Sequence, residues 1–535
     1  MLDYYSAFRK PAYNSSLYTG CDMGRFDPMN AIVILREEIA TALAANGSSP
    51  ETSIELGGSP VLKDYATYLH ETIHWWQHVG TTSGMHYGLC IPSQALTTIQ
   101  YLIDAGTGAS KPLMSSARDD ISSDDPAVLA VQRWADAEFG AAILFSPLLS
   151  ASILEKYPQH FTSCGDAIVH LMISNLWSIS RALDPTFQGL QDPREWFDSI
   201  DRLATEGASC FDGRQPVEIA LGMEDVFEGQ ARFCELQYLH RCYENRSWRE
   251  IEESGSVSGV YGTAFDYLIK HSNVPRPIDS CDPTINLFLV LCDIASNPHD
   301  GYPCKFQGDD ELIHRLHPGI RFMTLCHAVS EHSSVRELSR DPSPDAYREI
   351  TDRLCGALGW STPTEVAHQA VATIQAMSEY SKIASVKTTG KYGSLDVPIV
   401  FYFQQQEHLL SSKIQHPHFF CWPGLFLTTL VESDASEKSQ ELLNDHIPPF
   451  QSSSFDAGID IINLKLHGES RDLFVSDYFT TQILYDFVRQ WISAKGGFSF
   501  DYKWKGAISE QELRTIKNRF KSSFSFELDD IAVSM

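Results

Sequence analysis

The stretch PVLKDYATYLHETIHWWQHV, residues 60–79, predicts a long amphipathic helix. Ser59 is a favourable N-cap residue, and Pro60 suits the first helical position because its missing N–H costs nothing there. Apolar side chains then recur at helical spacing, at Leu62, Tyr65, Leu69, Ile73 and Trp76. We expect this apolar face to lie against the core of the protein.

A neighbouring face of the same helix carries His70 and His74, four residues apart. This spacing points two imidazoles at one ion, and Glu71 beside them can reach a water at that ion. Zinc uses such nitrogen ligands, and a catalytic zinc keeps one position open for water. The alternative is a core helix whose two histidines are merely hydrogen-bonded. We predict a metal site at His70 and His74, with Glu71 as the general base.

Two polar residues follow on the same helix, Gln77 and His78. Gln77 shares the histidine face, so we expect it to orient His74 by a hydrogen bond. His78 lies a full turn beyond His74, and one straight helix rarely wraps three histidines around one ion. We therefore place His78 outside the ligand set.

The third ligand must come from another segment of the chain. The segment EDVFEGQARFCE, residues 224–235, carries Glu228 next to the small residues Gly229 and Ala231, which let this helix approach another closely. Glu228 is our candidate for the third ligand, and Glu224 remains the alternative. On spacing alone, an ordinary acidic helix face explains these glutamates equally well.

The pattern His-Glu-x-x-His with a distant helical glutamate resembles the gluzincin class of metallopeptidases. Locally, the run from Glu228 to Glu235, Glu-Gly-Gln-Ala-Arg-x-x-Glu, is similar to Glu-Ser-Gln-Ser-Arg-x-x-Glu in the carboxypeptidase Taq family. The first glutamate of that family's segment is its third zinc ligand, which implies Glu228 here. The resemblance covers two short segments, and His74 and Glu228 are farther apart than in that family. It implies a zinc-dependent peptidase with a helical, zincin-like catalytic domain.

A basic run, HRLHPGIR at residues 314–321, lies near a predicted turn. Hydrolysis of a peptide bond needs a donor for the oxyanion besides the metal. We name His317 and Arg321 as catalytic candidates for that role. The simpler interpretation is a helix end with solvated basic side chains.

Residues 29–383 show mainly helical periodicity, and the composition changes at residues 384–398. Beyond this point come three strand-like runs, at residues 397–403, 460–466 and 497–502. We therefore expect a mainly α fold with a helical metallopeptidase-like domain of residues 1–389. A smaller α/β domain of residues 390–535 would follow, and it is a candidate for binding a protein partner.

The chain has 535 residues and a formal net charge of −28. Nucleic-acid and anionic-membrane surfaces need a clustered basic face, and none stands out in this sequence. The N-terminal run MLDYYSAFRKPAYNSS lacks a signal peptide's apolar core, and no apolar run is long enough for a bilayer. The twelve cysteines contain no Cys-x-x-Cys pair, which favours free thiols. We expect a cytoplasmic protein that acts on a peptide or protein substrate.

Two other interpretations of the motif stay open. Glu71-x-x-His74 and Glu311-x-x-His314 are pairs of the kind that di-iron carboxylate proteins place on two bundle helices, with Glu38 one helix upstream of the first pair. However, residues 274–310 contain no glutamate that could serve the second pair, and His70 would have no role. The other interpretation is a helical binding protein without enzymatic activity.

Overall fold

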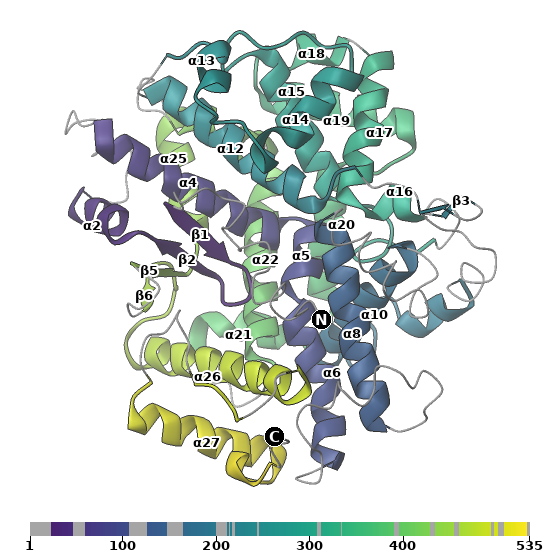
Figure 1. Cartoon of the computed structure of the whole chain (residues 1–535), viewed down its shortest axis with the longest axis vertical. Helices are drawn as coiled ribbons and strands as arrows, with labels where there is room; N and C mark the ends of the chain where they lie inside the picture. Colours follow the sequence, from purple (N-terminus) through teal and green to yellow (C-terminus); the bar gives the residue numbers. More distant parts are fainter. Residues whose placement is uncertain are drawn as a thin grey trace.

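The computed structural model describes residues 23–46, 59–105, 126–146, 164–199, 211–212, 215–216, 220–242, 245–307, 312–332, 334–389, 395–427, 434–453, 459–493, 497–500 and 508–531. Most of these residues lie in α-helices, and a small four-stranded sheet lies beside them (Figure 1). The predicted mainly α fold is therefore confirmed. None of the described helices combines the length and the hydropathy needed to cross a bilayer. The described cysteines are all free thiols.

The helices of the first half of the chain are α2 (Glu37–Asn46), α4 (Ser59–Gly80), α5 (Thr82–Gly88), α6 (Cys90–Ala105), α8 (Pro126–Phe145), α10 (Cys164–Leu183), α12 (Met223–Cys242), α13 (Trp248–Glu253) and α14 (Val260–His271). Those of the second half are α15 (Pro283–Ser296), α16 (Leu312–Leu316), α17 (Pro318–Glu331), α18 (Ser334–Leu338), α19 (Pro344–Leu358), α20 (Pro363–Ala376), α21 (Tyr380–Thr389), α22 (Val397–Gln415), α23 (Pro417–Cys421), α24 (Pro423–Phe426), α25 (Asp434–His446), α26 (Gly468–Ser493) and α27 (Glu510–Phe524). Two short 3₁₀ helices, η2 (Pro193–Trp196) and η3 (Leu528–Asp530), complete them.

Helix α4 extends one residue beyond the predicted stretch 60–79 at each end, and it packs along α12 (Figure 1). The side chains of Ser59 and Pro60 lie outside the described residues, so their capping role stays a prediction. Helix α12 in turn contacts α14 and α15. The predicted close approach at Gly229 is present, because a Cβ atom there would lie 3.0 Å from the Phe288 ring of α15.

The sheet has the order β1 (Gly24–Asp27), β2 (Ile32–Leu35), β5 (Phe450–Ser452) and β6 (Ile459–Ile461). Strands β1 and β2 pair antiparallel, β2 and β5 parallel, and β5 and β6 antiparallel. Strand β1 is thus an edge of this sheet, and it contacts α4. A separate two-stranded ladder joins β3 (Phe211–Asp212) and β4 (Gln215–Pro216).

The predicted strand at residues 397–403 is wrong, because these residues form the start of α22. A short apolar run is compatible with a buried strand or a buried helix, and periodicity alone does not separate the two. The helix is buried here because it packs against α4, α20 and α26. Pro398 lies in the first turn of α22, where its missing N–H is tolerated.

The other two strand predictions are also mostly wrong. Of residues 460–466, only the first two belong to a strand, β6. Residues 497–500 are not in a strand, and residues 501–502 lie outside the described residues. Since β5 pairs with β2, the sheet combines segments from both ends of the chain. The division into domains of residues 1–389 and 390–535 stays a prediction.

A buried ion pair fastens the C-terminal end of α4 to the rest of the protein. Lys413 Nζ of α22 lies 2.6 Å from Asp293 Oδ1 of α15, and it also donates to Gly80 O at 3.3 Å. The Tyr347 hydroxyl donates to Asp293 Oδ2 at 2.5 Å. The two charged side chains are only 10% and 4% exposed. Each charge therefore depends on the other to offset the free energy lost on leaving water.

We expect Lys413→Met to destabilise the protein by about 3–5 kcal/mol, because Asp293 would be left buried without its partner. The double variant Lys413→Met/Asp293→Asn should lose less than the sum of the two single variants. Urea unfolding followed by circular dichroism measures both effects. Lys438→Met, which removes an exposed ion pair with Glu441, is the matched control and should change nothing measurable. A loss at Lys413 no larger than in this control would contradict the prediction.

Candidate metal centre

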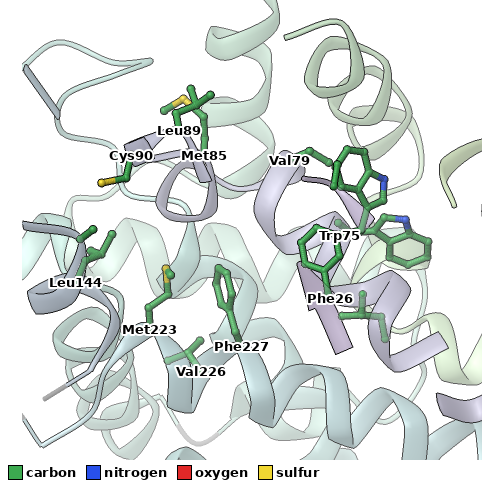
Figure 2. Packing of buried hydrophobic residues seen from close by; sticks show 14 of the residues in the cluster. Phe26, Trp75, Val79, Met85, Leu89, Cys90, Leu144, Met223, Val226 and Phe227 are labelled. Carbon is green, nitrogen blue, oxygen red and sulfur yellow. The ribbon is translucent and has the colours of Figure 1, made fainter. Parts of the chain in front are cut away.

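Three predicted ligands meet where α4 packs on α12. His70 and His74 lie on α4, and Glu228 lies on α12. Apolar side chains lie beside this contact: the Trp75 and Phe26 ring centroids are 6.0 Å apart, and Figure 2 shows both rings together with Val226 and Phe227 of α12. The three side chains form one of the groups in the described residues whose ligand atoms lie within 4.8 Å of one another. We call them the His70 cluster.

The ligand atoms of the His70 cluster form a nearly equilateral triangle. The Nε2 atoms of His70 and His74 lie 3.1 Å apart. Glu228 Oε2 lies 3.5 Å from His70 Nε2 and 3.4 Å from His74 Nε2. In a tetrahedral site with zinc bonds of 2.0–2.1 Å, ligand atoms lie about 3.3 Å apart. The triangle therefore has the dimensions of three corners of such a site.

The other ring nitrogen of His70 is held by Glu235. His70 Nδ1 lies 3.2 Å from Glu235 Oε2, which in turn lies 2.7 Å from the guanidinium Nη1 of Arg232. Burial opposes ionisation of Glu235, but Arg232 and His70 outweigh it and lower the pKa of this carboxyl to about 2. An ionised carboxylate only accepts hydrogen bonds, so His70 Nδ1 carries a proton and donates it. Nε2 is then the atom that faces the cluster.

The ring of His74 is held by Gln77, as the sequence predicts. His74 Nδ1 lies 2.8 Å from Gln77 Oε1. The Gln77 amide donates to Phe227 O and to Gln230 Oε1, at 2.8 Å and 2.9 Å, which fixes its orientation. His74 Nδ1 must therefore be the donor to Gln77, and its Nε2 also faces the cluster. Hydrogen bonds of this kind orient histidines that bind metals.

Three acceptor atoms that face one point require a positive charge among them. In the protein without metal, a proton on His70 can supply that charge. Burial disfavours the imidazolium form, but hydrogen bonds to Glu228 and Glu235 and the charge of Glu71 outweigh it and raise the pKa of His70 to about 10. Burial likewise opposes ionisation of Glu228, but the two histidines outweigh it and hold the pKa of Glu228 well below its usual range. A proton and a metal ion therefore compete for this place.

Glu71 is buried next to the cluster, and its side chain lies against β1. A Cβ atom on Gly24 would lie 2.9 Å from Glu71 Cγ and 3.0 Å from Glu71 Oε1. Burial raises the pKa of Glu71, although His70 and His74 oppose this shift. A carboxylate with a raised pKa is a better proton acceptor. Gly24 was not identified from the sequence, because nothing there shows that β1 passes beside the motif.

The structure does not bring His317 and Arg321 to the cluster. Both are fully buried. His317 precedes α17, where its Nδ1 accepts from Ile320 N at 3.4 Å, and its Nε2 lies 3.1 Å from Ile143 O. Arg321 donates to main-chain carbonyls at the end of α15, including Ile294 O at 2.9 Å. These contacts are structural, since a cation at a helix C-terminus satisfies the carbonyls exposed there. The solvated helix end that we considered is wrong, because both side chains are buried, and their catalytic role stays a prediction.

Tyr261 of α14 is a polar side chain near the cluster that the sequence did not single out. Its ring meets the His70 ring edge-on, with centroids 6.0 Å apart, and the Arg232 guanidinium lies 5.5 Å from its centroid. Burial and the nearby Glu228 carboxylate raise the pKa of Tyr261, so the hydroxyl keeps its proton. No local motif marks this residue, because it reaches the cluster only through the packing of α14 on α12.

The remaining histidine of the motif helix, His78, lies outside the ligand set as predicted. It is buried, and its ring centroid lies 5.3 Å from that of Phe26 and 5.8 Å from that of Phe227. Burial and the neighbouring His74 lower the pKa of His78 to about 3. His78 is thus a neutral core residue.

The alternative ligands do not join the cluster in the described part of the chain. Glu224 lies one turn before Glu228 on α12 and is not in the group of three. For the di-iron interpretation, Glu38 and His314 are exposed, and Glu311 lies outside the described residues. Within the described residues, Glu228 is therefore favoured over Glu224 as the third ligand, and a site for one ion is favoured over a di-iron site.

Comparison of the chain with protein-family models, with curated proteins and with solved structures finds no match. The resemblance to gluzincins and to the carboxypeptidase Taq family stays a prediction.

We expect Glu228→Ala to lose zinc, because one corner of the triangle disappears. Glu224→Ala is the matched control on the same helix and should keep it. Metal content of the purified variants, measured by mass spectrometry, tests this pair. Zinc retained by Glu228→Ala and lost by Glu224→Ala would exchange the two assignments.

We expect the affinity for zinc to rise with pH, because the ion must displace the proton of His70. The raised pKa of His70 keeps that proton in place at neutral pH, so affinity should rise about tenfold per pH unit between about pH 6 and 8. Titration calorimetry in buffers of different ionisation enthalpy should detect about one proton released per zinc bound. Binding without proton release would contradict this account of the cluster.

Proposed function

We propose that the protein is a zinc-dependent hydrolase that cleaves a peptide or protein bond. The observation that carries the proposal is the triangle of His70, His74 and Glu228 with the buried Glu71 beside it. Its edges suit a tetrahedral zinc site in which a fourth position remains for water. The ligand histidines donate hydrogen bonds to Glu235 and Gln77, and such bonds orient the histidines of known zinc sites.

Each residue of the site has a separate task in this proposal. Zinc bound there would polarise the scissile carbonyl and lower the pKa of a bound water to about 7. Glu71 accepts the proton of the attacking water and passes it to the leaving amine. The Tyr261 hydroxyl donates to the oxyanion, the task for which the sequence suggested His317 and Arg321. Gly24 leaves the space that the Glu71 side chain needs.

A peptide substrate is favoured by the position of β1. Among the described strands, β1 is one of the two edges of its sheet, and it runs beside Glu71. An extended peptide that paired with this edge would lie along the cluster, because main-chain hydrogen bonds align an added strand with its neighbour. Recognition of a protein partner by residues 390–535 belongs to the same proposal, since β5 and β6 extend this sheet.

Metal analysis of the purified protein separates the proposal from its two alternatives. We expect about one firmly bound zinc per chain, since the His70 cluster is the most buried of the three groups of potential ligands in the described residues. Two irons per chain would support the di-iron oxidoreductase instead, and no bound metal would support the binding protein.

We expect Glu71→Gln to keep zinc and to lose peptide hydrolysis by about 10²- to 10⁴-fold, because an amide does not accept the proton. Cleavage of a mixed peptide library, followed by mass spectrometry, measures this loss over many peptide sequences at once. Asp64→Asn, on the same helix, is the matched control and should keep both zinc and activity. Full activity of Glu71→Gln would show that Glu71 is not the base.

A further inference from the structure

Another group of potential metal ligands joins α22 to the end of α25. It consists of His408 of α22 and of Asp445 and His446 at the end of α25, and their ligand atoms lie within 4.8 Å of one another. Lys465, which follows β6, reaches into the same place. We call these four residues the His408 cluster.

A cation already lies where two of these ligands converge. Lys465 Nζ lies 3.2 Å from His408 Nε2 and 3.0 Å from Asp445 Oδ1. An ammonium group only donates hydrogen bonds, so the lone pairs of both residues point at Nζ. The second oxygen of the same carboxylate, Asp445 Oδ2, lies 3.6 Å from His408 Nε2. This arrangement is a cation site that a side chain of the same protein fills.

His446 gives independent evidence that this site binds a ligand other than the Lys465 ammonium. Its side chain is only 4% exposed, and its ring centroid lies 4.4 Å from that of His408. Within the described residues, the buried Nε2 atom of His446 has no hydrogen-bond partner. Buried polar atoms in folded proteins nearly always have a partner.

We propose that His408, Asp445 and His446 form a second metal site, which binds zinc or another divalent ion of its class when that ion displaces Lys465. Two imidazoles and one carboxylate are a ligand set that zinc uses. Lys465 can leave, because its side chain is 47% exposed and flexible. His408, Asp445 and Lys465 line a small hollow of about 20 Å³, which has room for a single water molecule as fourth ligand.

The surroundings indicate a structural task for this ion. The Asn463 amide donates to Asp445 O and Ile447 O, at 3.2 Å and 3.0 Å. Trp76 Nε1 of α4 donates to His446 O at 2.8 Å. An ion bound here would fasten α22 to the end of α25, and Trp76 lies only two residues beyond His74. The second site would thus stabilise the contact between α25 and the motif helix.

Titration of the metal-stripped, full-length protein with Co²⁺ and with Zn²⁺ tests the proposal. We expect two classes of site, a tight one at the His70 cluster and a weaker one at the His408 cluster. His408→Gln and His446→Gln should each remove the weaker class and keep the tight class, and His74→Gln should do the reverse. If the wild-type protein has one class of site, which His408→Gln removes and His74→Gln keeps, the result counts against the proposed hydrolase and leaves the second site standing. A wild-type protein in which no class of site is lost in His408→Gln and His446→Gln would overturn the proposal.

Lys465→Met gives a second measurement that does not depend on the fold of a histidine variant. Because it removes the competing ammonium, it should tighten the weaker class by about tenfold or more. Lys438→Met on α25 is the matched control and should leave the affinity unchanged. An unchanged affinity in Lys465→Met would overturn the idea that Lys465 occupies the metal position.

Discussion

The packing of α4 on α12 brings two imidazole nitrogens and a carboxylate oxygen to one buried point, and a positive charge has to lie there. Glu228 and Glu235 are both held in the ionised form inside the protein, which would be costly without a compensating cation. A proton on His70 or a metal ion supplies this cation. The conformation of the whole region depends on this compensation, because Arg232, Gln77 and Gln230 are each oriented by a partner in the same network.

The remainder of the fold holds α4 in place along its length. Strand β1 lies against Glu71, the Trp76 indole binds the end of α25, and Lys413 binds the last carbonyl of the helix. These contacts come from segments far apart in the chain. Ligands on a regular helix that is fixed at several points keep their distances better than ligands on a loop. The precise triangle is therefore a consequence of packing that lies outside the motif.

The predictable part of the site was the part encoded within single helices. A helix places residues four apart on one face, so His70, His74 and Gln77 could be assigned from spacing alone. Glu228 needed the additional sign of a small neighbour, Gly229, and the resemblance of its segment. The positions of Tyr261 and Gly24 beside the cluster depend on which elements pack together, and so does the burial of Arg321. The sequence contains no local sign of that packing. The helix at residues 397–403 was missed because a short apolar run suits a buried strand as well as a buried helix, and periodicity alone does not separate the two.

The same physical rule holds at the His70 cluster and at the His408 cluster, although their surroundings differ. Lone pairs that converge need a cation, and where no metal lies the protein supplies its own, a proton on His70 in one case and the ammonium of Lys465 in the other. A proton leaves without any movement of the chain, whereas Lys465 must swing into solvent and give up its contacts with His408 and Asp445. The His70 cluster is also the more buried, with an acidic or amide partner behind each histidine. Preorganisation therefore predicts that the His70 cluster binds the same ion more tightly than the His408 cluster does.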